Sequence, residues 1–110
     1  MTTSDGGGLV LDTIQDTVEG TMPFREQVVP PAAGLVQWAY SLVVQGLEGE
    51  APFTVTLLDA AGEQVAADQA IEGVASIEGA LGQQTYELRI EGARPMAFRA
   101  IRSQTYGYRQ

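Results

Sequence analysis

Hydrophobic and polar residues alternate one by one along much of this 110-residue chain. Because successive side chains of a β-strand point to opposite faces of a sheet, such a period of two predicts half-buried strands. The longest alternating run covers 36–45 and places Trp38 and Tyr40 on its apolar face, where we expect both to belong to the core. The expected strands lie at 8–13, 16–21, 24–29, 36–45, 53–57, 63–68, 74–78, 85–91 and 97–101.

Turn-forming residues separate these segments at intervals of about 8–12 residues, as in β-sandwiches. Asp59 and Gly62 hold the first and fourth positions of one turn, and two consecutive prolines make 29–34 a stiff connection. No internal repeat is present at a fixed period. The sequence therefore predicts an all-β fold, a single antiparallel β-sandwich of the jelly-roll kind with about eight or nine strands.

The length fits one domain, and the ends differ in composition from the middle. Residues 1–8 contain Thr, Ser, Asp and three glycines, which bury too little apolar surface to offset the entropy of ordering. We therefore expect a flexible N-terminal arm at 1–8, a sandwich domain at 9–102 and a C-terminal tail at 103–110.

Two segments carry a resemblance to a known family. They are FTVTLLDAAGEQV at 53–65 and GQQTYELRI at 82–90, followed by a final strand around Phe98. From 52 to 101 the chain resembles the jelly-roll sandwich of bacterial pre-peptidase C-terminal domains and related galactose-binding-like modules. The resemblance implies a sandwich fold and the role of a secreted accessory module without catalysis of its own.

The composition removes much of enzyme chemistry. Histidine and cysteine are absent and all six basic residues are arginine, so the chain offers no imidazole base, no thiolate nucleophile and no Schiff-base amine. Carboxylate pairs are the remaining catalytic option, and we interpret them instead as solvated acids that keep a sandwich soluble. The sequence thus predicts a protein that is not an enzyme.

Oxygen-rich loops leave calcium as an alternative to the expected absence of any cofactor. Acidic loops of β-sandwiches can supply the six to eight oxygen ligands that Ca²⁺ takes. No Asp-x-Asp-x-Asp-Gly loop is present. The weak candidate ligands are Asp12, Asp16, Glu19, Asp59 and Glu63.

The formal net charge of −8 is unevenly distributed. Residues 1–88 contain thirteen acidic residues and one arginine, whereas 89–110 contain five arginines and one glutamate. A basic end and an acidic body can attract each other within one fold or between neighbouring copies. Both interpretations stay open at this point. The acidic body also disfavours nucleic acid as a partner.

We interpret the chain as a non-catalytic structural or interaction module of a larger assembly, and we favour a virion component such as a capsid decoration or tail protein. Its expected partners are copies of itself or other structural proteins. The alternative is a carbohydrate- or surface-binding accessory module, whose partner would be a glycan. The residues expected at contacts are Phe24, Arg99, Arg102, Tyr106, Tyr108 and Arg109.

Neither a membrane span nor a secretory signal is expected. No apolar run approaches the ~18 residues that cross a bilayer, and the first residues lack a basic start and an apolar segment. We therefore expect a protein made in the cytoplasm, with no membrane partner; its final location is left open, and incorporation into a virion belongs to the favoured assembly role.

Overall fold

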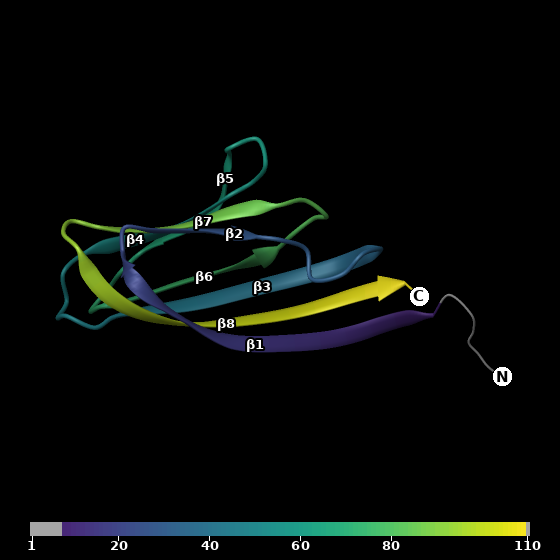
Figure 1. Ribbon diagram of the computed structural model, residues 1–110, viewed down its shortest axis with the longest axis horizontal. Coiled ribbons are helices and arrows are strands. Elements are labelled where there is room, and N and C mark those ends of the chain that lie inside the picture. Colours follow the sequence, from purple (N-terminus) through teal and green to yellow (C-terminus); the bar gives the residue numbers. More distant parts are fainter. Residues whose placement is uncertain (1–7, 110) are drawn as a thin grey trace.

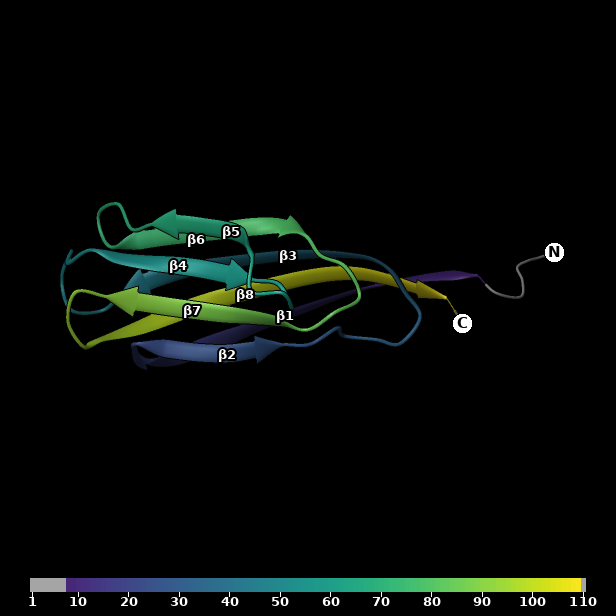
Figure 2. The same cartoon turned by 90° about the horizontal axis from the view of Figure 1, so that it is seen from above.

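Eight strands form two four-stranded antiparallel sheets that face each other across one hydrophobic core (Figures 1 and 2). The computed structural model describes residues 8–109, and within them it contains no helix that could cross a membrane. The strands are β1 (Leu9–Met22), β2 (Phe24–Val28), β3 (Leu35–Gly46), β4 (Phe53–Leu58), β5 (Gln64–Gln69), β6 (Val74–Ala80), β7 (Tyr86–Gly92) and β8 (Met96–Arg109).

The connectivity is that of a jelly roll, as the sequence predicts. One sheet has the strand order β1-β8-β3-β6 and the other the order β2-β7-β4-β5, so sheet neighbours come from distant parts of the chain. We call them the long sheet and the short sheet. β1 and β8 pair without a bulge from Leu9↔Arg109 to Met22↔Met96. At the end that carries Leu9 and Arg109, these two strands extend beyond the short sheet (Figures 1 and 2).

The structure differs from two expectations about the ends of the chain. The segments 8–13 and 16–21 are one continuous strand, β1, rather than two. Residues 103–109, expected as a tail, continue β8, because they pair with β1 on one side and with β3 on the other. The expected N-terminal arm lies outside the described residues except for Gly8.

The core is built from the inward-facing positions of both sheets, and Trp38 and Tyr40 are buried in it as predicted. At one end of the core the rings of Phe24 and Phe98 pack edge to face, with their centroids 5.1 Å apart. Gly20 makes that contact possible, since a Cβ there would lie 3.1 Å from Phe24 and 3.2 Å from Phe98. The other buried residues are Met22, Val28, Leu42, Val44, Phe53, Val55, Leu57, Ala75, Ile77, Tyr86, Leu88, Ile90, Met96, Ala100 and Tyr106.

Candidate assembly interface

β1 is a 14-residue strand with only one neighbour in its sheet. The amide of Arg109 donates to the carbonyl of Gly34, so odd-numbered residues of β8 face β3 and even-numbered ones face β1. Alternate residues of an antiparallel strand direct their amide and carbonyl to opposite sides. The odd-numbered residues of β1, from Leu9 to Thr21, therefore present their backbone groups to an open edge.

One contact on β1 supports this assignment. The amide of Thr13 donates to Oδ1 of Asp12, at 2.9 Å, instead of to β8. An amide that bonds the neighbouring side chain is one that the sheet has left without a backbone acceptor. The described residues provide no other hydrogen bond to the outward-facing amides of β1.

The edge of β1 has few of the devices that protect sheet edges. Proteins block such edges with proline, lysine, bulges or charged side chains, because an open edge is a template for a further strand. β1 contains no proline, no basic residue and no bulge. Two of its three acids turn back to β8, where Asp16 binds Arg102 and Glu19 binds Arg99. The edge is thus long, regular and only weakly protected.

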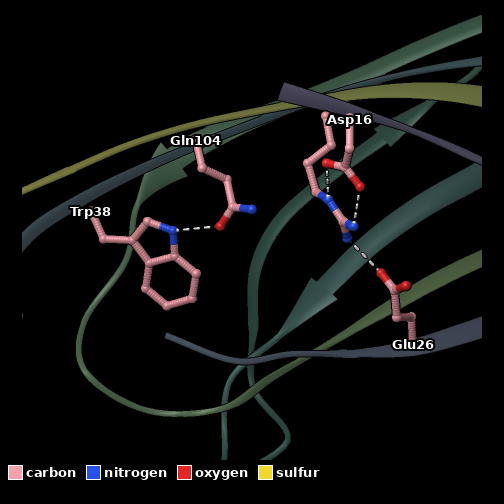
Figure 3. A network of polar contacts seen from close by, with 5 residues as sticks. Asp16, Glu26, Trp38 and Gln104 are labelled. Atoms are coloured by element: carbon pink, nitrogen blue, oxygen red, sulfur yellow. Dashed lines mark hydrogen bonds and ion pairs between the residues drawn. The ribbon is translucent and has the colours of Figure 1, made fainter. Parts of the chain in front are cut away.

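Arg102 adds side-chain hydrogen bonds to the backbone pairing of β1, and Figure 3 shows two of its partners, Asp16 and Glu26. Its guanidinium donates two hydrogen bonds to Asp16, at 3.1 and 2.7 Å, and one to Glu26 on β2, at 2.6 Å. The Arg102 side chain is only 15 % exposed, and the hydrogen bond that it donates lowers the pKa of the Asp16 carboxyl. We call these three residues the Arg102 clamp. The clamp joins β1, β8 and β2, so it fastens the edge strand to both sheets.

Beside the clamp, the indole Nε1 of Trp38 donates to Oε1 of Gln104 at 2.8 Å (Figure 3). The Trp38 ring meets Tyr86 edge to face at 5.8 Å. Among the described residues, the hydroxyl of Tyr40 is the only buried side-chain polar atom without a hydrogen-bond partner, and burial raises its pKa. Trp38 and Tyr40 are interior residues and cannot act as a surface platform for a glycan.

A side chain from the short sheet occupies part of the opposite edge of the long sheet. β6 bonds β3 on one side, and on its other side the amide of Ser76 donates to Oδ2 of Asp68 at 2.9 Å. Asp68 lies on β5, a strand of the short sheet that contacts β6. A single carboxylate from the other sheet therefore occupies the middle of the β6 edge.

Most arginines of the basic end pair with acids of the same chain. Four of the five arginines after residue 88 are paired inside the chain, so the first of the two interpretations holds for them. Where the Arg89–Glu87 pair forms, the hydrogen bond from the arginine lowers the pKa of the glutamate. The pairs are Arg89–Glu87 at 2.6 Å, Arg94–Glu48 at 3.8 Å, Arg99–Glu19 at 2.9 Å, and Arg102 with Asp16 and Glu26 at 2.7 and 2.6 Å.

The six residues expected at contacts fall into two groups. Phe24, Arg102 and Tyr106 lie mostly inside the molecule, Phe24 against Phe98 and Arg102 in the clamp. Burial and the nearby Asp12 carboxylate raise the pKa of the Tyr106 hydroxyl. The remaining three lie near the surface. Arg99 and Arg109 are exposed, and Tyr108 is half-buried with its ring stacked on Tyr106 at 6.0 Å. Roles for these residues at contacts stay predictions.

The five candidate calcium ligands do not gather at one site, and several of them bind other groups of the chain. Asp16 and Glu19 bind arginines, and Oδ1 of Asp59 accepts the amides of Ala61 and Glu63 at 2.9 Å, as its turn position predicts. Within residues 8–109, no three acidic side chains gather in a way that could hold a metal ion. The structure does not bring the predicted calcium ligands together.

Comparison with known proteins supports the fold and little more. No protein-family model matches the chain, and no curated protein matches it. Among solved structures, a protein of Bacillus endospore appendages, which form disulfide-linked pili, matches with a TM-score of 0.65 and 14 % identity over 96 % of both chains. The shared feature is the fold, because the identity is low.

The resemblance inferred from 52–101 is confirmed as a weak one. The pre-peptidase C-terminal domain of Bacillus anthracis collagenase matches with a TM-score of 0.48 and 9 % identity, over 87 % of this chain and 89 % of that one. VP2 of infectious bursal disease virus matches with a TM-score of 0.37 and 14 % identity, over 92 % of this chain and 33 % of that one. Neither likeness is close enough to carry a statement about function.

Proposed function

We propose that this chain is a non-catalytic structural module of a larger assembly and that the open edge of β1 is its main assembly surface. The observation that carries the proposal is a 14-residue edge strand in unbroken register with β8. An edge of this length presents a row of free amides and carbonyls to which another strand can bond. A monomer gains nothing from such an edge, whereas a subunit gains a binding surface.

The other edges of the sandwich are poorer assembly surfaces. β2 and β5, at the edges of the short sheet, have five and six residues. The middle of the β6 edge is occupied by Asp68. The contrast supports β1 as the surface that contacts a neighbouring subunit.

The fold neighbour from Bacillus endospore appendages is a protein of assembled fibres, which is compatible with a structural role for this sandwich. Those pili are disulfide-linked, and this chain has no cysteine, so its own assembly would be non-covalent. A fibre subunit is one version of the proposal. A virion component, either a capsid decoration or a tail protein, is the version favoured by the sequence. Electron microscopy of the particles formed distinguishes the two.

The substitution Gln15→Pro tests the proposal. Gln15 directs its amide outward, so proline removes a donor from the open edge without removing a bond to β8, and edge strands tolerate proline at such positions. We expect the purified wild-type chain to have a solution mass above that of a monomer, and Gln15→Pro to shift it to the monomer. Light scattering behind size exclusion, at low and high salt, measures this.

Gln15→Ala is the matched control, because it removes the same side chain and keeps the amide. It should assemble like the wild type. A wild-type chain that stays monomeric at all concentrations, or a Gln15→Pro variant that assembles normally, contradicts the proposal. Circular dichroism and a thermal midpoint confirm that the proline variant is folded.

A further inference from the structure

We infer that the strand bound by β1 is the β1 strand of a second copy of this chain, antiparallel to the first, with a two-fold axis at Gln15. The inference rests on the proposed function, because it names the occupant of the same edge. The pairing would merge two four-stranded long sheets into one continuous sheet across the interface. Such a contact uses the same surface on both copies and is therefore closed.

Backbone geometry limits the ways in which two β1 strands can pair. Only the odd-numbered residues of β1 carry outward-facing amides and carbonyls, so each must lie opposite an odd-numbered residue of the second copy. Allowed registers therefore differ by shifts of two residues. With Gln15 opposite Gln15 of the second copy, the paired region runs from Leu9 to Thr21 and uses nearly the whole strand.

The acids of β1 disfavour the two neighbouring registers. A shift of two residues in one direction places Asp12 directly opposite Asp16 of the second copy. The same shift in the other direction places Asp16 opposite Asp16. Like charges directly opposite each other destabilise a strand pair. In the register centred on Gln15, Asp12 lies opposite Val18 and Asp16 opposite Ile14, so no acid faces another directly.

The side chains on the outer face also match in this register. Gln15 lies opposite itself and Thr13 opposite Thr17, which are pairs that hydrogen-bond across strands. Leu9 and Leu11, which are 49 % and 60 % exposed, would be partly covered by the second copy. The pairing therefore buries apolar surface at both ends and joins polar side chains in the middle.

Among the edge strands of a second copy, β1 is a better partner for β1 than β2, β5 or β6. The β6 edge of a second copy is occupied at Ser76 by Asp68, and its β2 and β5 edges are too short to pair with a strand of 14 residues. β1 itself is the one edge of the described sandwich that matches β1 in length. The best partner for the β1 edge is therefore the β1 edge of the second copy.

Single cysteines test the register directly, because the chain has none of its own. Gln15→Cys places two thiols across the two-fold axis, with Cα atoms about 5.5 Å apart, within the range for a disulfide. Thr13→Cys and Thr17→Cys each place the two thiols about 14 Å apart, out of reach. After mild oxidation we expect a covalent dimer from Gln15→Cys alone. Mixing the Thr13→Cys and Thr17→Cys variants should also give a covalent dimer.

The outcomes separate this inference from the proposed function. If Gln15→Pro abolishes assembly and Gln15→Cys gives no covalent dimer, another strand occupies the edge; the inference is then overturned and the proposed function stands. A covalent dimer from Thr13→Cys or Thr17→Cys alone overturns the register. If Gln15→Pro leaves assembly intact, both fall.

Discussion

The two edge strands of the long sheet, β1 and β6, differ in how their outer backbone groups are treated. β6 has seven residues, and the amide in its middle is bonded by a carboxylate that reaches over from the short sheet. β1 has 14 residues, and the one outward amide with a partner bonds the adjacent side chain of Asp12. One edge thus has an amide bonded by a residue of the other sheet, whereas the bonded amide of the other edge has only its sequence neighbour as a partner.

From this difference we expect the long sheet to be extended more readily at β1 than at β6. A sandwich with two open edges can join neighbours on both sides and grow into an unlimited ladder. With Asp68 bonded to the β6 edge, we expect strand pairing through the long sheet to stop after one added strand. Growth into a fibre or a shell then needs a second surface of another kind, and the exposed apolar residues of the long sheet's outer face, Val43 and Ile101, lie where such a contact could form.

Removing the Arg102 clamp should have the largest effect, because the clamp fixes the position of the open edge. Arg102→Met leaves Asp16 and Glu26 without their cation. Breaking a buried ion pair costs about 3–5 kcal/mol, and we expect about 2 kcal/mol here, since the two carboxylate side chains are 41 % and 33 % exposed. Urea unfolding measures the loss. Arg102→Lys, which keeps the charge but not the two-fold bond to Asp16, should lose less. Equal stability of all three chains would show that the clamp does not hold β1.

Acid should weaken the same clamp from the side of Asp16. Its pKa is lowered in the folded protein by the hydrogen bond from Arg102, so Asp16 adds stability above the unfolded pKa of about 3.9. That contribution is lost as the pH falls through the lower folded pKa. We expect the urea midpoint to fall from pH 5 toward pH 2. Asp16→Asn should show a flatter profile in this range, and a profile parallel to the wild type would rule out this role for Asp16.

Opening the β6 edge should make the two edges alike. Asp68→Ala removes the acceptor for the amide of Ser76, at a cost of about 1 kcal/mol, and leaves a backbone donor free on β6. We expect the variant to form species larger than those of the wild type, measured by sedimentation velocity. Asp68→Asn, whose amide oxygen still accepts a hydrogen bond, should behave like the wild type. If Asp68→Ala keeps the wild-type mass, the carboxylate is not what closes β6.

The sequence could predict the core but not the edges. The alternation that places Trp38 and Tyr40 in one face is a local signal, and it indicates burial whatever strand lies alongside. The edge of β1 depends on which strand is adjacent, and the pair between Asp16 and Arg102 joins residues 86 positions apart. The sequence predicts two strands, at 8–13 and 16–21, where the structure has the single strand β1. An edge strand that extends past the opposing sheet is solvated on both faces there, so its hydrophobic alternation disappears.

Cutting the outer ion pair of β1 should have the smallest effect on stability. Arg99 donates to Glu19 at 2.9 Å across the β8–β1 pair, and both side chains are more than half exposed. Exposed ion pairs contribute about 0.5 kcal/mol and are screened by salt, so Arg99→Met should lower the urea midpoint slightly at low salt and not at high salt. Its effect on assembly should be larger than its effect on stability. Glu19 without Arg99 carries a free charge on the open edge, where charged side chains oppose strand pairing. A small loss of stability with a clear fall in solution mass would show that Arg99 matters more for pairing of the β1 edge with a second strand than for folding. An unchanged mass at low salt would show that Arg99 contributes only to stability.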